Sequence, residues 1–359
     1  MKSLRRPILA SAGALLLAVS LSACGSSAGG IDAVKLRVNT GVGPSHHLVT
    51  NVFEPWKEYV EQESGGKVTV EIYNGDTLGS LNSALTDLSN GVYDAGVIVP
   101  TYFQDSGAFP LTIASLAYAY PDLEVGNVVM DEFAEQFAED ISVEGVHLVD
   151  TSVSDTYSIF SKTPIRSVDD LSGQQVKVQG EADAALIEQW GANPVQIATS
   201  ETYQALERGT IDAAPYTLVG NAGTNFQEVA PFVTQVNAWG TLSTPAMSQA
   251  FLDSLSPELR QQFDEDFLPE LADLNDATYG KALEAAQSGL AEKLDEADGE
   301  LIELSETELS RFQEGAAPQW EAWKAQAEGM GYDGQAMINA WMELLEGEGA
   351  TLPQIESEQ

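Results

Sequence analysis

The fold is decided by residues 171–216, which read LSGQQVKVQGEADAALIEQWGANPVQIATSETYQALERGTIDAAPY. The β-branched residues of 174–179 predict a strand. A helical pattern follows over 182–190 and stops at a glycine, and a second strand is expected over 195–198. Strands that alternate with helices at this spacing predict an α/β fold with a mainly parallel sheet.

The second half of this stretch continues the same alternation. Ser200 is expected to cap the next helix and Gly209 to end it. The short strand predicted over 210–214 then delivers Tyr216 at its end. Lys177 lies near the carboxyl end of the first strand, where open α/β sheets bind their ligands. It is therefore a candidate anion ligand, and the alternative is a solvated surface lysine.

Four motifs of the chain resemble one family of receptors. They are DLSGQQVKV (170–178), GANPVQIATSETYQALERGTIDA (191–213), SGGKVTVEIYNGDTLG (64–79) and LSNGVYDAG (88–96). Together they resemble the dicarboxylate-binding type of extracytoplasmic solute receptor of TRAP (tripartite ATP-independent periplasmic) transporters. The resemblance implies a two-lobed periplasmic-binding-protein fold with mixed, mainly parallel sheets. It also implies a small organic solute and the permease subunits of a TRAP transporter as partners.

The first 23 residues have the pattern of a signal peptide. Cations precede an apolar run that is too short for a good transmembrane span and ends in Leu21-Ser22-Ala23-Cys24. Cys24 is the only cysteine and would become the acylated N-terminus. Residues 24–33 are then a lipidated tether. We expect an extracytoplasmic protein that is lipid-anchored to the outer face of the bacterial cytoplasmic membrane.

Length and charge limit the size and the partners of the chain that remains after the leader is removed. Removing 23 of 359 residues leaves 336, enough for two domains. The formal charge is −39, and it becomes −42 without the three cations of the leader, which excludes nucleic acid as a partner. We expect one lobe to comprise 34–154 and 242–282, and the other to comprise 155–241 and 283–359. A helix of roughly 45 Å beginning near Pro269 would span both lobes.

The sequence contains no recognisable catalytic set. It has a single cysteine, no phosphate-binding loop and no HExxH motif. His46, His47 and His147 are expected to cap or pack, because a metal site needs further converging ligands. The protein is therefore predicted to be no enzyme and to use neither metal nor cofactor.

The candidate site residues are those at positions where the family resemblance implies contacts with the solute. Lys177 stands where the family carries an arginine that grips the substrate carboxylate with two nitrogens, and lysine lacks that fork. Tyr216 stands where the family has an asparagine. Further positions at or beside family contacts are Tyr157, Tyr102, Trp239, Thr199, Ser80 and Ser243. Phenol rings with a polar tip favour a less polar, ring-containing solute over a short dicarboxylate.

The resulting prediction is a solute-binding receptor that captures an organic acid between two lobes. Two alternatives stay open at this point. One is a lipid-anchored hydrolase on a similar scaffold, and the other is the receptor of an ABC-type importer.

Overall fold

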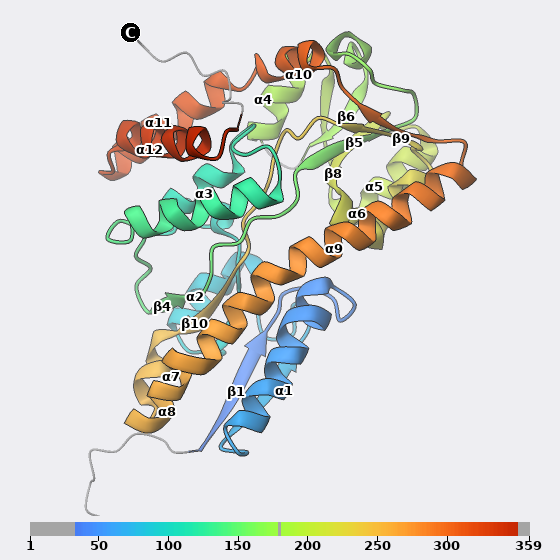
Figure 1. Ribbon diagram of the computed structural model, residues 1–359. Coiled ribbons are helices and arrows are strands. Elements are labelled where there is room, and N and C mark those ends of the chain that lie inside the picture. Colours follow the sequence, from blue (N-terminus) through green and yellow to red (C-terminus); the bar gives the residue numbers. More distant parts are fainter. Residues whose placement is uncertain (1–32, 179–180, 351–359) are drawn as a thin grey trace, which may run out of the picture.

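The computed structural model describes residues 33–178 and 181–350, which form two β-sheets flanked by helices (Figure 1). The first sheet has the strand order β2-β1-β3-β10-β4. Its strands are β1 (Val34–Asn39), β2 (Val68–Tyr73), β3 (Ala95–Ile98), β4 (Val146–Leu148) and β10 (Thr244–Ser248). β1 pairs in parallel with β2 and β3, whereas β10 runs antiparallel to β3 and β4.

The second sheet has the order β11-β9-β5-β8-β6-β7. Its strands are β5 (Tyr157–Ser161), β6 (Gln175–Val178), β7 (Asn193–Gln196), β8 (Ala213–Thr217), β9 (Phe232–Gln235) and β11 (Glu300–Glu303). β6 pairs in parallel with β7 and β8, and β5 runs antiparallel to β8 and β9. The predicted α/β class with mixed sheets is confirmed.

The chain crosses from one sheet to the other along two adjacent segments. A β-bridge joins Val153 to Leu242. The N–H of Ser154 donates to the carbonyl of Thr241 at 2.8 Å. These bonds hold the outgoing segment (153–157) against the returning segment (239–242), and we call the pair the crossover.

A third connection is the long helix α9 (Leu268–Glu296), drawn in orange in Figure 1. Its 29 residues correspond to about 43 Å at 1.5 Å per residue. At one end it packs on η1 (Leu48–Phe53) and α1 (Glu54–Glu63), and at the other on α6 (Leu218–Thr224) and β11. The predicted long helix is confirmed, and Pro269 lies in its first turn, directly after the π-helical turn η7 (Phe263–Phe267).

Helices cover the sheets through apolar faces. Leu36 and Val38 of β1 and Trp56 and Val60 of α1 are fully buried. The remaining helices include α2 (Ala84–Ser89), α3 (Leu123–Gln136), α4 (Glu181–Gln189), α5 (Thr199–Arg208), α7 (Gln249–Ser254), α8 (Pro257–Gln262) and α10 (Glu306–Gln313).

The last two helices, α11 (Ala317–Met330) and α12 (Gly334–Gly347), pack beside α3 and the segment η4 (Phe109–Ser115). Three indole N–H groups fix them there. Trp320 donates to the carbonyl of Ala117 at 2.9 Å, Trp323 to the hydroxyl of Thr112 at 2.8 Å and Trp341 to the carbonyl of Ala119 at 2.8 Å. The C-terminal helices therefore contact a segment that precedes the crossover.

Three boundaries in the decisive stretch differ from the prediction. β7 starts at Asn193 and contains Pro194, which is tolerated because β7 is the edge strand of its sheet. The N-cap of α5 is Ala198 rather than Ser200. β8 begins at Ala213, because its register is set by pairing with β5, so Tyr216 lies inside the strand rather than beyond it.

Candidate ligand-binding site

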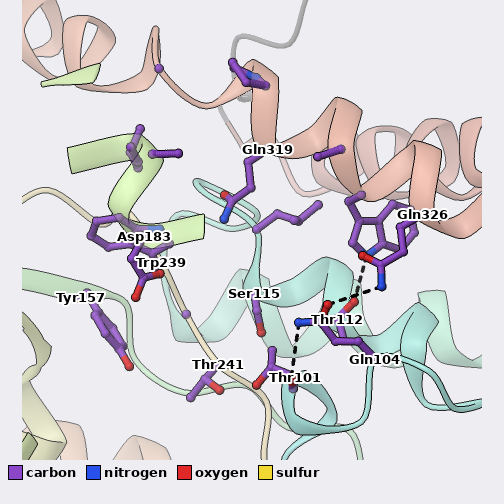
Figure 2. Close-up of a pocket in the computed structure, with 18 of the residues that line it drawn as sticks. Thr101, Gln104, Thr112, Ser115, Tyr157, Asp183, Trp239, Thr241, Gln319 and Gln326 are labelled. Carbon is purple, nitrogen blue, oxygen red and sulfur yellow. Dashed lines mark hydrogen bonds between the residues drawn. The ribbon is translucent and has the colours of Figure 1, made fainter. Parts of the chain in front are cut away.

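A cavity of about 750 Å³ opens at the crossover (Figure 2). Its walls come from both sides of the crossover: Thr101, Tyr102 and the η4 segment on one side, and α4 on the other, with α11 above. The size is typical of a site for a small organic ligand. The lining is aromatic (Tyr102, Tyr157, Trp239, Trp323), amide (Gln104, Gln189, Gln319, Gln326) and hydroxyl-bearing (Thr101, Thr112, Ser115, Thr241).

The crossover places two of the predicted aromatic residues in this cavity. Trp239 and Tyr157 lie on its two segments, and their ring centroids are 6.3 Å apart at 69°. Trp190 of the segment after α4 stands behind Trp239 at 5.4 Å. The indole Nε1 of Trp239 is buried and has no hydrogen-bond partner in the described part of the chain.

Lys177 lies in the third position of β6 and is only 2 % exposed, so it is not a solvated surface lysine. It lines a small hollow of about 10 Å³ together with Val178, Pro215 and three residues of the large cavity, Tyr157, Asp183 and Trp239. Burial lowers the pKa of Lys177 to about 8, although the nearby Asp183 carboxylate raises it. At neutral pH the amine therefore remains largely protonated.

The other predicted residues occupy different places. Tyr102 lines the cavity and is 51 % exposed. Tyr216 lines neither hollow and packs behind the site, with its ring 6.2 Å from that of Tyr157 and 5.3 Å from that of Phe226. Burial raises the pKa of Tyr216.

Thr199, Ser80 and Ser243 also line neither hollow. Ser243 is buried and its hydroxyl lies 2.7 Å from that of Tyr279 on α9. Ser80 hydrogen-bonds with Ser83, and Thr199 is the first residue of α5. The structure thus places Tyr102, Tyr157 and Trp239 in the lining of the cavity and Lys177 in the adjoining hollow. The residues that line neither are Tyr216, Thr199, Ser80 and Ser243.

Asp183 and Gln319 are lining residues that the sequence did not single out. Asp183 follows the end of β6 within the first turn of α4, so the same rule that selects Lys177 could have found it. Gln319 could not be found in this way, because α11 reaches the cavity from far along the chain. Its Oε1 accepts a hydrogen bond from the N–H of Ala117 at 2.6 Å.

The arginines of the described chain are engaged elsewhere. Four form ion pairs and one bonds a glutamine: Arg37 with Asp94 (2.8 Å), Arg166 with Glu300 (2.5 Å), Arg260 with Asp264 (2.8 Å), Arg311 with Asp169 (2.8 Å) and Arg208 with Gln204 (3.4 Å). None of these five lines the cavity. The guanidinium fork that the family resemblance leads one to expect is absent from this lining.

The paired histidines pack rather than converge with other ligands. The rings of His46 and His47 are stacked with centroids 4.2 Å apart, and His47 meets the edge of Tyr279 at 4.9 Å. Burial lowers the pKa of His47 to about 3. Across residues 33–178 and 181–350, no helix combines the length and apolar character needed to cross a bilayer.

Comparison with known proteins identifies the family. The family model described as "Bacterial extracellular solute-binding protein, family 7" matches residues 38–326. A solute-binding protein of Sulfitobacter sp. (strain NAS-14.1) is 26% identical over 271 residues, which cover 74% of this chain and 78% of that protein.

Solved structures show the same fold. A TRAP periplasmic solute-binding protein of Desulfovibrio salexigens, in an open complex, has a TM-score of 0.78 at 23% identity and covers 90% of this chain and 99% of its own. One of Sulfitobacter sp. NAS-14.1 with bound β-D-galacturonate has a TM-score of 0.72 at 20% identity and covers 86% of this chain and 100% of its own. The resemblance to TRAP receptors is confirmed. The chain belongs to family 7 of the bacterial extracellular solute-binding proteins.

Proposed function

We propose that the protein captures a small organic acid between two lobes and delivers it to the permease subunits of a TRAP transporter. The observation that carries this proposal is the cavity of about 750 Å³ at the crossover, walled by residues from both sides of it. The lobes are those expected from the sequence, 34–154 with 242–282 and 155–241 with 283–359, and α11 and α12 of the second lobe reach across to pack on α3 and η4 of the first. The acid bound by the Sulfitobacter relative supports the ligand class.

In this proposal the solute is held by one cation and several rings. Lys177 takes the carboxylate, and Tyr157 and Trp239 pack on the body of the solute. Tyr102, which is half exposed, covers the solute when the lobes close by a hinge motion at the crossover. Tyr216 supports Tyr157 from behind. Thr199, Ser80 and Ser243 do not touch the solute directly.

A thermal-shift screen with organic acids, sulfonates and aromatic compounds tests the binding function. A ligand at 100 times its Kd should add about 2.7 kcal/mol of stability. Lys177→Ala should weaken a carboxylate by the equivalent of a charge-assisted hydrogen bond, roughly ten- to a hundredfold. Lys281→Ala, which removes an exposed lysine of α9, should leave binding unchanged. A lack of response from every compound would refute the proposal.

Neither catalysis nor another importer class is needed to explain this site. The family consists of solute-binding proteins, which supports a receptor without turnover. Incubation with generic ester, phosphate and glycoside substrates checks this point, and measurable turnover would favour a hydrolase. Genomic neighbours that encode a small and a large membrane subunit without an ATPase would support TRAP over ABC coupling.

We also propose that the protein is extracytoplasmic and lipid-anchored through Cys24, which lies outside the described residues. The support is the apolar leader that ends in Leu21-Ser22-Ala23-Cys24. Cys24→Ala should leave ligand binding intact and move the protein from the membrane fraction to the soluble fraction, or block its processing. A variant that is still processed and acylated would refute the anchor.

A further inference from the structure

Two consecutive residues of α11 hold one peptide unit beside the cavity. Gln319 Oε1 accepts from the backbone N–H of Ala117 at 2.6 Å, and Trp320 Nε1 donates to the carbonyl oxygen of the same residue at 2.9 Å. Ala117 is fully buried, so its N–H needs an acceptor within the protein. Trp323 adds its bond to Thr112 further along the helix. The position of α11 against the segment before the crossover is therefore fixed by several hydrogen bonds.

The bond to Ala117 decides which way the amide group of Gln319 points. An amide carries its acceptor on the oxygen and its two donors on the nitrogen. A backbone N–H can be met only by the oxygen, so the two amide atoms cannot be exchanged. None of the residues 33–178 and 181–350 accepts a hydrogen bond from Nε2. Gln319 lines the cavity, and Figure 2 shows its side chain extending from α11 towards Ser115. Its Nε2 is thus a donor of fixed orientation in the cavity wall.

The other three glutamines of the lining differ from Gln319. Gln326 Nε2 donates to Gln104 Oε1 at 3.4 Å, and Gln104 Nε2 donates to the carbonyl oxygen of Thr101 at 3.3 Å. Gln189 is exposed and forms no hydrogen bond within the described part of the chain, so nothing there fixes its amide. A donor that is oriented before binding loses less entropy when it meets a ligand. Gln319 is therefore the lining amide best prepared to recognise a solute atom.

Gln319 and Lys177 lie on different sides of the crossover. Lys177 belongs to β6 of the second sheet, whereas Gln319 is held through Ala117 to the segment that follows η4. The neutral donor on Nε2 pairs with an acceptor oxygen, and the charged amine of Lys177 pairs with a carboxylate. A solute that meets both groups therefore connects the two sides of the cavity.

We propose that Gln319 is a specificity-determining residue, whose Nε2 donates a hydrogen bond to an acceptor oxygen on the body of the solute. Lys177 takes the carboxylate of the same molecule. This inference rests on the proposed function, and it adds a second recognition point supplied by the C-terminal helix α11. The preferred solutes are acids that carry an acceptor oxygen besides their acid group.

Two matched pairs of probes test this contact. The aromatic pair is 4-acetylbenzoate and 4-isopropenylbenzoate, and the aliphatic pair is 4-oxopentanoate and 4-methylpent-4-enoate. Within each pair only the carbonyl oxygen is replaced, by a methylidene group of similar shape. Calorimetric Kd values are measured for the wild-type protein, for Gln319→Glu and for Gln326→Glu. The last variant adds the same charge to the same helix and the same cavity lining, so it is the matched control.

In at least one pair the wild-type protein should bind the carbonyl probe about three- to tenfold more tightly, the effect of one neutral hydrogen bond. Gln319→Glu replaces the donor with an acceptor and should abolish or reverse this preference. Both probes of a pair carry the same carboxylate, so a general loss of affinity from the added charge cancels in the ratio. Gln326→Glu should keep the wild-type ratio.

A purely structural role for Gln319 predicts a different result. The carboxylate introduced by Gln319→Glu still accepts from the N–H of Ala117, so a residue that only holds α11 in place would keep the wild-type ratio. Gln319→Leu removes that acceptor and should lower the melting temperature, whereas Gln319→Glu should not. The infrared carbonyl band of the bound 4-acetylbenzoate or 4-oxopentanoate tests the contact in the wild-type protein, because it shifts to lower wavenumber when the oxygen accepts a hydrogen bond.

Four results overturn the inference. They are equal Kd values within both pairs for the wild-type protein, a Gln319→Glu protein that keeps the wild-type ratio, an equal change of the ratio in Gln326→Glu, and an unshifted carbonyl band. If the probes bind and Lys177→Ala weakens them but one of these results is found, the proposed function stands and the role of Gln319 fails. If none of the four probes binds, the role of Gln319 fails, and the thermal-shift screen alone decides the function.

Discussion

The backbone N–H of Tyr157 donates a hydrogen bond to the carbonyl oxygen of Trp239 at 2.8 Å, and the two rings meet edge-on with centroids 6.3 Å apart. The outgoing and returning segments of the crossover therefore carry their aromatic side chains as one unit. Both rings line the cavity and the small hollow that contains Lys177. A solute that packs on this pair would contact both segments of the crossover, which connect the two sheets.

Trp239 should report binding through its fluorescence. Its indole is 5 % exposed and lines the cavity, so a bound solute changes its surroundings directly. In the wild-type protein we expect ligand to quench or shift the tryptophan emission. Trp239→Phe should lose part of this signal, Trp323 on the cavity wall giving the remainder, and should keep measurable binding by calorimetry. Trp56→Phe, in the core of the first sheet, is the control and should retain the signal. An undiminished signal both in Trp239→Phe and in Trp323→Phe would place the solute outside this cavity.

The affinity for a carboxylate should depend on pH through Lys177. Burial lowers the pKa of Lys177 to about 8 in the free protein. Below that pH the amine is charged and attracts an anion. As pH rises through about 8 the charge is lost, so affinity should fall, by at most about tenfold per pH unit. Titration calorimetry between pH 6.5 and 9.5 measures this dependence.

Lys177→Gln is the matched control, with low affinity that stays flat over the same pH range.

Lys177→Arg separates charge from shape. The hollow of about 10 Å³ has no room for a guanidinium group without repacking, so this variant should bind more weakly than wild type despite keeping the charge. Unchanged affinity in Lys177→Arg, or a wild-type affinity that is constant up to pH 9.5, would argue against Lys177 as the anion ligand.

The sequence predicted the parts of the site that follow local rules. Lys177 comes at the end of a strand, and the alternation of strands and helices around it identifies that strand. The sequence did not predict that Tyr216 lies within β8, because the register of β8 depends on its pairing with β5. It also did not predict Gln319 in the cavity, since only tertiary packing brings α11 onto the η4 segment.

Asp155 should make the stability of the fold depend on pH. This carboxylate is 3 % exposed on the outgoing crossover segment, and its Oδ2 accepts from the N–H groups of Leu218 and Val219 at 2.7 and 3.2 Å. Burial raises the pKa of Asp155 to about 6, and the two backbone hydrogen bonds lower it less. Between the unfolded pKa of about 4 and the folded pKa, the folded protein holds the proton more strongly. Stability from this group is therefore full below pH 4 and lost as pH rises through about 6.

Asp155→Asn should remove this pH dependence, which changes the free energy of unfolding by at most about 3 kcal/mol. Urea titrations from pH 4 to pH 7.5 measure it as the difference between variant and wild type. Asp333→Asn removes an exposed carboxylate that caps α12 and serves as the matched control. A difference between Asp155→Asn and wild type that is the same at every pH would show that burial does not perturb this carboxyl in solution.

The stability of the fold should require a glycine at position 240, because Tyr120 fills the space beside it. The hydroxyl of Tyr120 donates to the carbonyl of Ser154 at 3.0 Å on the opposite crossover segment. A Cβ placed on Gly240 would lie 1.6 Å from that hydroxyl oxygen. Gly240→Ala must push either the ring or the segment aside, and such overpacking costs roughly 1–3 kcal/mol. Because Gly240 lines the cavity, ligand affinity should fall as well.

Gly280→Ala provides the contrast. Gly280 lies inside α9, and nothing stands within 4 Å of the place where its Cβ would be. This change should stabilise the protein by about 0.5–1 kcal/mol, because alanine favours the helix. The double variant Tyr120→Ala/Gly240→Ala tests the steric cause, since removing the ring frees the space that the new Cβ needs. Its cost should be less than the sum of the two single costs, as for any two residues in direct contact. Additive costs would show that the cost of Gly240→Ala does not come from its contact with Tyr120.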